Sequence, residues 1–275
     1  MERLQRNSRA HPAFFLMAWL GLLLLLPRTV AANPQVPDVE EILRRFLARA
    51  REAAEVEARQ EICYLRKTRV EQLTEDGTVR ESRSKEHSVT NRAGVIHAWL
   101  VKVDNQEPTE RDLSTDRRGD SEARKESGRR RKGPDFLDEA LVRRFSYRFE
   151  AEEQIEGRRV FRLAYEPRTD AADSNTNVDR LLGALHGHLW IDAEEYELVK
   201  VEARLRSALR LLGGIVGSLN RLEFAIQRRP IEPGHWANVL LTTRAEGRKL
   251  FSSFRARVQV DHDAFSIRPL NPATP

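Results

Sequence analysis

Cysteine is almost absent from this chain of 275 residues, since Cys63 is its single cysteine. One cysteine cannot form a disulfide within the chain, which excludes the small disulfide-stapled class of secreted domains. The Gly-x-Ser-x-Gly and His-Glu-x-x-His motifs and a Cys/His pairing suited to catalysis are also missing. Cys63 lies in a strand-like pattern, so we expect it to be packed rather than nucleophilic. The sequence therefore predicts no enzyme activity, no catalytic residue and no cofactor.

A large excess of one charge is also lacking once the N-terminus is set aside. Residues 1–32 combine three early arginines, an apolar run over residues 13–26 and the small residues Val30-Ala31-Ala32, the pattern of a cleavable signal peptide. The run is short for an uncleaved membrane anchor, which needs roughly 20 residues. Without residues 1–32, which hold four Arg and one Glu, the net charge falls from +5 to about +2. We therefore expect export to the periplasm and no binding of nucleic acid.

Apolar and polar residues alternate along most of the remaining chain. The clearest example is Gly187–Leu205, which predicts a β-hairpin: Val199, Val201, Ala203 and Leu205 share one face of its second arm. One amphipathic helix precedes the strands. It begins at Asp38, with Glu41 placed as the partner in a capping box, and its apolar stripe continues to about Glu57.

About ten such strands, joined mainly by short turns, predict a mainly β (α+β) fold. A flat antiparallel meander of this size leaves one face and two edges uncovered. We therefore expect a curved antiparallel sheet that forms an unclosed β-barrel, with the N-terminal helix packed in its concave face. Residues 33–265 are predicted to form this single domain, followed by a Pro-rich tail over residues 266–275. A charged segment at about 104–134, which we expect to be a long loop or a charged helical excursion, interrupts it. Its basic part 117–133 is better explained as a solvated loop than as a site for anionic head groups.

The order of elements resembles the outer-membrane lipoprotein-sorting (periplasmic lipoprotein carrier) superfamily. The resemblance rests on Phe161-Arg162-Leu163-Ala164-Tyr165-Glu166-Pro167, on Gly187-His188-Leu189-Trp190-Ile191-Asp192 with the following Val199-Lys200-Val201-Glu202, and on Gly234-His235-Trp236. It covers most of residues 38–262, apart from the long charged segment. It implies a helix-capped open barrel whose apolar cavity takes lipid acyl chains.

Eight apolar residues are predicted to line the cavity between helix and sheet. They are Leu43, Phe46, Trp99, Phe161, Leu163, Trp190, Phe224 and Trp236. A metal site is not expected, because His188 and Asp192 lie about 13 Å apart on an extended strand. Residues 213–217 contain three glycines but match no phosphate-binding pattern, which favours a flexible apolar loop.

The leading hypothesis is a non-catalytic periplasmic protein that binds an apolar ligand, a lipid acyl chain or a lipoprotein, and that takes part in lipoprotein or lipid trafficking to the outer membrane. The alternative is a structural or assembly module of the cell envelope, which contacts envelope proteins or a membrane surface and whose barrel interior is filled by side chains. A hydrolase is less consistent with the sequence, since no convergent polar cluster is evident.

Overall fold

The computed structural model describes residues 37–117, 139–168, 177–211, 217–249 and 252–270. They belong to one compact unit that comprises residues 37–275. The predicted signal peptide, nearly all of the basic segment 117–133, most of the glycine-containing loop 213–217 and the end of the Pro-rich tail lie outside the described residues.

The described residues form three helices with printed bounds and eleven strands. The helices are α1 (Val39–Glu57), α3 (Glu139–Val142) and α4 (Asn177–Leu182). The strands are β1 (Gln60–Leu73), β2 (Val79–Arg92), β3 (Val95–Val103), β4 (Phe145–Ile155), β5 (Arg158–Pro167), β6 (Leu185–Asp192), β7 (Leu198–Leu205), β8 (Leu209–Leu211), β9 (Gly217–Glu232), β10 (His235–Lys249) and β11 (Ser252–Pro269).

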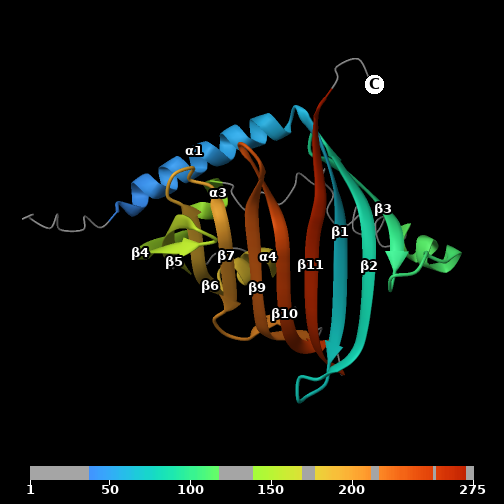
Figure 1. The fold of residues 1–275 in the computed structure, drawn as a ribbon. Coiled ribbons are helices and arrows are strands. Elements are labelled where there is room, and N and C mark those ends of the chain that lie inside the picture. Colours follow the sequence, from blue (N-terminus) through green and yellow to red (C-terminus); the bar gives the residue numbers. More distant parts are fainter. Residues whose placement is uncertain (1–36, 118–138, 169–176, 212–216, 250–251, 271–275) are drawn as a thin grey trace, which may run out of the picture. The chain divides into compact units, whose positions relative to one another are not determined.

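All eleven strands belong to one antiparallel sheet, which confirms the predicted fold class. The order across the sheet is β3-β2-β1-β11-β10-β9-β7-β6-β5-β4, with β8 paired to β9, and the sheet is not closed into a barrel (Figure 1). It departs from a meander in chain order at two places, because β1 pairs with β11 and β7 pairs with β9. Both edges, β3 and β4, therefore come from the middle of the chain, and residues 104–144 connect them.

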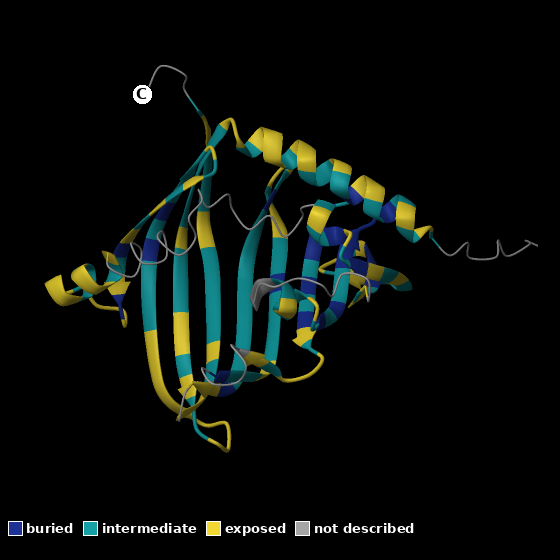
Figure 2. Cartoon of the chain, turned by 180° about the vertical axis from the view of Figure 1, so that it is seen from behind, coloured by how far each residue is buried: buried dark blue, intermediate teal, exposed yellow. Residues whose placement is uncertain are grey.

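The main core lies between one face of the sheet and the three helices, and we call this face the inner face. Ile42 and Phe46 of α1 are 3% and 2% exposed and pack in one cluster with Leu163 and Ile191 of the sheet. Val142 of α3 belongs to the same cluster. The periodic apolar stripe of α1 is thus what holds it on the sheet. Figure 2 places the buried residues mainly near the first turns of α1 and the strands beside them.

The start of α1 matches the predicted cap only in part. Asp38 is the N-cap, and its side chain accepts a hydrogen bond from the backbone N–H of Glu40 at 3.0 Å. Glu41, however, binds Arg44 and Arg45 with its carboxylate, which lowers the pKa of Glu41 to about 2. Two arginines within one helical turn offer this carboxylate stronger donors than the N-cap amide does.

The β6–β7 hairpin is confirmed, and Gly187 explains one of its sequence features. A Cβ atom at Gly187 would lie 1.9 Å from the carbonyl oxygen of Glu202 on the neighbouring strand. Tyr165 pairs with Gly187 from the other side, and its hydroxyl donates to that same carbonyl at 3.1 Å. Glycine is therefore required here, because any side chain would separate β6 from β7 and displace the Tyr165 ring.

One residue of the predicted hairpin face is on the other face. The pairing shifts where Trp190 pairs with Lys200 and Ile191 pairs with Leu198. Val199 is the extra residue in this bulge, and it packs with Trp190 and not with Val201. The strict alternation read from the sequence was wrong at Val199, because a bulge exchanges the faces of a strand at the residue it inserts.

The turn after β6 is organised by Asp192, which is 1% exposed. Its Oδ1 accepts from the backbone N–H groups of Glu194 (2.9 Å) and Glu195 (2.7 Å), and its Oδ2 accepts from Arg158 Nε at 2.6 Å. Burial alone would raise the pKa of Asp192, but the hydrogen bonds from Arg158, Glu195 and Glu194 outweigh it and lower the pKa. The charged carboxylate therefore fixes the loop in one conformation.

The next turn residue, Glu197, ties α1 to the sheet. Glu197 is 3% exposed, and its two carboxylate oxygens lie 2.9 Å from Arg49 Nε of α1 and 2.9 Å from Arg228 Nη1 of β9. Oε1 has no hydrogen bond of good geometry, so the contact with Arg49 is an ion pair. Arg49 also donates to the carbonyl of Gly234 at 2.8 Å. This clamp, Glu197–Arg49–Arg228, holds α1 near one end of the strands.

Regular structure is present in part of the charged segment, for which a helical excursion was one of the two expectations, and in the first residues of the predicted tail. Residues 110–117 are helical, and Asp112 and Asp116 of this helix pair with Arg83 (2.6 Å) and Lys85 (2.5 Å) of β2. At the other end, β11 continues to Pro269, which pairs with Gln60. Both segments are polar, and the neighbouring strands stabilise them through contacts that a local sequence pattern does not contain.

Candidate ligand-binding surface

The inner face changes character between two parts of the sheet. The short-strand half, β4 to β7, has strands of 8 to 11 residues, and the long-strand half, β9, β10, β11, β1 and β2, has strands of 14 to 18 residues. In the short-strand half the inner face is filled by the core around Leu163, which is fully buried. Among the described residues, the inner face is left partly uncovered in the long-strand half.

A set of small and apolar side chains, here called the inner strip, crosses the long-strand half. Cross-strand pairing places Val70 opposite Val258, and Val260 opposite Leu241. Leu241 pairs in turn with Ile226 of the main core, so the strip lies on the inner face. Its members are Thr68, Val70, Leu222, Phe224, Leu241, Thr243, Ala245, Ala256, Val258 and Val260.

No member of the inner strip is buried, whereas the core beside it is fully packed. Val70 is 42% exposed, the other members are half-buried, and Phe254 at the end of the same row is 39% exposed. At one end of the strip, Leu222, Phe224 and Leu241 pack against the main core, and the row then continues away from it. When an apolar molecule covers a row of half-exposed apolar side chains, the free energy of the system falls.

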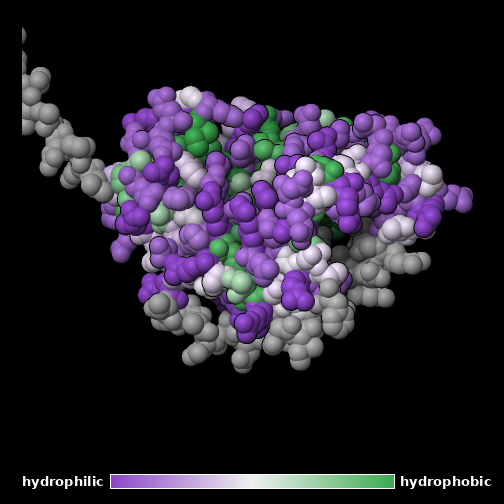
Figure 3. All heavy atoms as spheres, turned by 90° about the horizontal axis from the view of Figure 1, so that it is seen from below, coloured by the Kyte–Doolittle hydropathy of each residue, from purple (hydrophilic) through white to green (hydrophobic). Residues whose placement is uncertain are grey.

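The outer face of the same strands is charged. Arg257 and Glu71 form an ion pair at 2.6 Å, and Arg244 and Glu246 form one at 3.3 Å. Arg221 and Glu223 pair at 2.8 Å. This alternation indicates that the outer face is hydrated and that the inner face is the apolar side of these strands. Seen from below, most of the surface is hydrophilic, and hydrophobic side chains form small patches (Figure 3).

A polar row adjoins the inner strip on β11, β1 and β2. Arg66 pairs with His262 on one side and with His87 on the other, and Thr68 of the strip follows on the same face of β1. Tyr64, two residues earlier, contacts the His262 ring edge-on with centroids 5.0 Å apart. Burial raises the pKa of Tyr64. The pKa of His87 is lowered, first by burial and then by the charge of Arg66. The pKa of His262 is lowered by the same two causes, which outweigh the opposing hydrogen bond to the backbone of Asn238.

Five of the eight predicted cavity residues are brought together by the structure. Phe46, Phe161 and Leu163 belong to the buried core cluster, at 2%, 8% and 0% exposure, while Leu43 and Phe224 pack against it and are partly buried. Four of the five therefore lie in the filled half. Phe224 alone among them also belongs to the inner strip.

The remaining three predicted cavity residues lie elsewhere. Trp190 and Trp236 are buried on the outer face with Val160 and Val199. Trp190 Nε1 donates to Glu153 at 2.9 Å, and Lys200 Nζ lies 4.8 Å from the centre of its ring. Trp236 Nε1 donates to Glu195 at 2.9 Å. Trp99 on the edge strand β3 is 56% exposed and stacks on His97.

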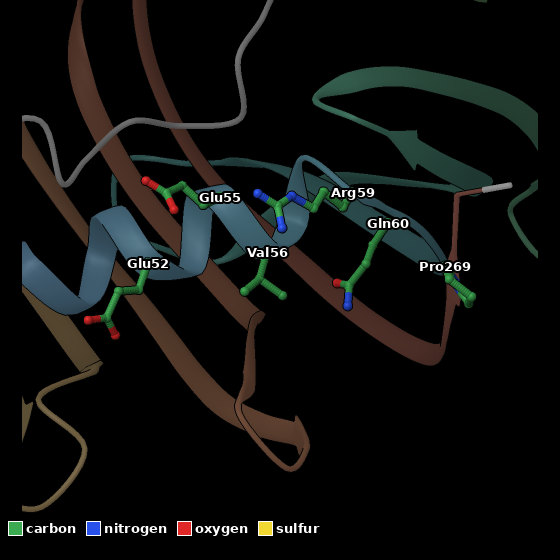
Figure 4. Close-up of a pocket in the computed structure, with 6 residues that line it drawn as sticks. All are labelled: Glu52, Glu55, Val56, Arg59, Gln60 and Pro269. Carbon is green, nitrogen blue, oxygen red and sulfur yellow. The ribbon is translucent and has the colours of Figure 1, made fainter. Parts of the chain in front are cut away.

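Hollows are also present elsewhere on the described residues. One of about 490 Å³ lies at the C-terminal end of α1 and is lined by Glu52, Glu55, Val56, Arg59, Gln60 and Pro269 (Figure 4). Another of about 190 Å³ lies on the outer face beside Trp236. The first hollow is lined by side chains of both charges. None of its lining residues is buried, and Val56 is 42% exposed, so it offers no buried polar group for chemistry.

Within the described residues, no group of three or more His, Cys, Asp or Glu side chains is arranged to hold a metal ion. His188 pairs with Glu150 at 3.2 Å, while Asp192 binds Arg158. Cys63 is a half-buried free thiol, 3.6 Å from Thr90 Oγ1. A search of the described helices finds none that is both long enough and apolar enough to span a bilayer.

The sequence signal for the inner strip was present but incomplete. The alternation of Ala256, Val258 and Val260 predicts one apolar face of β11, and the structure places all three on the strip. On β10 the sequence alternates at Trp236, Asn238 and Leu240, whereas the residue that pairs with Ile226 of the core is Leu241. The pairing with β9 shifts between Asn238 and Leu240, so Leu241 faces inward. Bulges of this kind are not visible in a hydrophobic pattern.

No protein-family model and no curated protein matches the chain. Several solved structures are similar in chain path. A chain described as an outer membrane lipoprotein-sorting protein domain from Vibrio parahaemolyticus aligns at 13% identity over 84% of this chain and 94% of its own, with a TM-score of 0.33. A LolA superfamily protein from Nitrosomonas europaea aligns at 9% identity, with coverage of 84% and 94% and a TM-score of 0.28. The MucA/MucB complex of Pseudomonas aeruginosa contains a chain that aligns at 10% identity, with coverage of 82% and 98% and a TM-score of 0.26. Two of the three descriptions name the family that the sequence resembles.

Proposed function

We propose that this chain is an exported, non-catalytic binding protein that holds an apolar ligand on the inner strip. The observation that carries the proposal is the half-exposed apolar row from Leu241 through Val258 to Val70, on strands whose outer face is charged. A row of this kind costs free energy in water and offers a long, narrow apolar contact.

The ligand class that fits this surface is an acyl chain. Each CH₂ group that leaves water contributes roughly 0.8 kcal/mol, so an acyl chain needs no pattern of hydrogen bonds to bind. The absence of a motif for polar recognition from the sequence agrees with such a ligand. With the predicted signal peptide and the resemblance to lipoprotein carriers, this leads us to propose a periplasmic protein that handles lipid or lipoprotein acyl chains on their way to the outer membrane.

A fluorescent fatty-acid probe tests the proposal directly. Val258→Asp places a charge on the inner strip, and we expect it to weaken the binding of cis-parinaric acid at least tenfold. Gln259→Asp is the matched control, because Gln259 is the next residue on β11, has similar exposure and faces outward. Equal binding by both variants and the unchanged protein would place the ligand elsewhere.

Lipid extraction and native mass spectrometry of protein purified from its own host supply an independent test. We expect a co-purifying lipid or acylated molecule. If no lipid co-purifies and the fatty-acid probe does not bind, the proposal is wrong.

The edge strand β3 favours a second candidate function, the binding of a protein partner. Trp99 is 56% exposed and Val95 is 38% exposed on this strand, whose outer edge pairs with no other described strand. Such an edge accepts an extended peptide, and an exposed Trp is a frequent anchor. Purification with cross-linking of the unchanged protein and of Trp99→Ala decides this: loss of a specific cross-linked protein in the variant supports partner binding, and identical products contradict it.

A further inference from the structure

Arg66 has no partner for its charge in the described part of the chain. It forms no ion pair or side-chain hydrogen bond there, and its Nε is a buried donor without an acceptor. The other half-buried arginines of the clamp and the turn, such as Arg228 and Arg158, are each matched to a carboxylate. A guanidinium that is half-buried without a counter-charge among the described residues lowers stability, so a role outside folding is the simplest account of it.

The carboxylate closest to this row is already engaged. Asp116 accepts from Lys85 Nζ at 2.5 Å and lies 3.1 Å from His87 Nε2. Burial opposes its ionisation, but the hydrogen bonds from Lys85 and His87 outweigh burial and lower its pKa. Asp261 of β11 faces outward and accepts from Gln259. Neither carboxylate neutralises Arg66.

His87 adds a second unsatisfied group. It is 6% exposed, and because a carboxylate can only accept, its Nε2 is the protonated nitrogen that donates to Asp116. Its Nδ1 is buried and has no hydrogen-bond partner among the residues that the structure describes. On the other side of Arg66, His262 donates through Nδ1 to the carbonyl of Asn238 at 2.8 Å. A cation flanked by two imidazoles thus faces inward at the border of the inner strip.

We propose that Arg66, flanked by His87 and His262, binds the anionic head group of an amphiphile whose acyl chain lies on the inner strip. This inference rests on the proposed function and adds the head-group chemistry to it. Arg66 and Thr68 are two residues apart on one face of β1, about 7 Å, so head group and chain are continuous. The charge of the head group pairs with the guanidinium and favours protonation of His87, which turns Nδ1 into a second donor.

Two probes that differ only in the head group test the site. The unchanged protein is expected to bind cis-parinaric acid about tenfold more tightly than its uncharged methyl ester, the gain of a charge-assisted hydrogen bond. Arg66→Gln is expected to lower the affinity for the acid to that of the ester and to leave the ester unchanged. Arg66→Lys should retain part of the preference. The control is Arg69→Gln, an exposed arginine on the opposite face of β1, which should change neither affinity.

The outcomes separate this inference from the function on which it rests. If Arg66→Gln keeps the preference for the acid, or the unchanged protein has none, the head-group site is wrong while binding on the strip stands. If neither probe binds the unchanged protein, both proposals fail. Displacement of the bound ester by palmitate, by lysophosphatidate and by uncharged monopalmitin identifies the head group: a stronger effect of either anion supports the site, and equal displacement by all three overturns it. Thermal unfolding separates a loss of binding from a folding defect, because Arg66→Gln is expected to leave the Tm unchanged or to raise it.

Discussion

The two halves of the sheet use the same alternating strands for different purposes. In the short-strand half, α1, α3 and α4 cover the inner face, and side chains such as Leu163 and Ile191 are fully buried. In the long-strand half, the inner row of Val70, Val258 and Leu241 stays half-buried although it is equally apolar. One half therefore provides stability, whereas the other provides an apolar surface whose contact with water lowers the stability of the fold.

The largest expected effect lies in the packed half. Leu163→Ala leaves a cavity in a fully buried site, and we expect the free energy of unfolding to fall by about 2–5 kcal/mol. Urea unfolding followed by circular dichroism measures it. Leu65→Ala is the control in the long-strand half, because Leu65, on the outer face of β1, is 38% exposed, and a loss of under about 1 kcal/mol is expected. Similar losses at the two positions would remove the distinction between a packed core and an exposed strand.

The second-largest effect on stability is expected at the clamp between α1 and the sheet. Glu197→Gln removes the charge that Arg49 and Arg228 share, and we expect a loss of about 3 kcal/mol because two partly buried cations lose their counter-charge. Hydrogen exchange should rise in α1 more than in β11. The matched variant is Glu194→Gln, a neighbouring exposed turn residue. If exchange rises uniformly, α1 and the sheet unfold as one unit and the clamp has no separate role.

A smaller, pH-dependent effect is expected from the long-strand half. The folded pKa of His87 lies below its ordinary value of 6.5, so the unfolded chain takes up a proton at a higher pH than the folded chain does. The contribution of His87 to the free energy of unfolding is therefore fully present above about pH 6.5, and it is lost as the pH falls towards the folded pKa. Each unit of difference corresponds to about 1.4 kcal/mol.

His87→Phe should flatten the dependence of Tm on pH between about 6.5 and 5. His97→Phe, at an exposed histidine of β3, should not. An unchanged slope in His87→Phe would mean that the pKa of His87 is the same in the folded and the unfolded chain.

The smallest effect is expected on the inner strip itself. Val258→Ser should lower the free energy of unfolding by about 0.5 kcal/mol, because its side chain is already half in water. The free energy of ligand binding should be reduced by more than the free energy of unfolding. A loss comparable to that of Leu163→Ala would show that the strip is part of the packed core, and it would erase the difference between the halves.

The sequence by itself determined the class of fold. The period of two in β7 and β11, the period of 3.6 in α1 and the turn residues between strands are local properties, and they led to an open antiparallel sheet with a helix on its face. The predicted cavity residues were selected by the same local rule, which finds apolar side chains but cannot tell a filled core from an open surface. Phe46 and Leu163 were therefore indistinguishable from Phe224 in the sequence.

Only the tertiary structure decided which apolar rows are covered. The bulges at Val199 and before Leu240 set the faces of Trp190 and Leu241, and each arises from the pairing of two strands and not from one strand alone. The row of His262, Arg66 and His87 likewise forms across β11, β1 and β2, which are distant in the chain. Pairing between strands fixes which side chains are neighbours, and a single charge without a partner becomes recognisable only when all of its neighbours are in place.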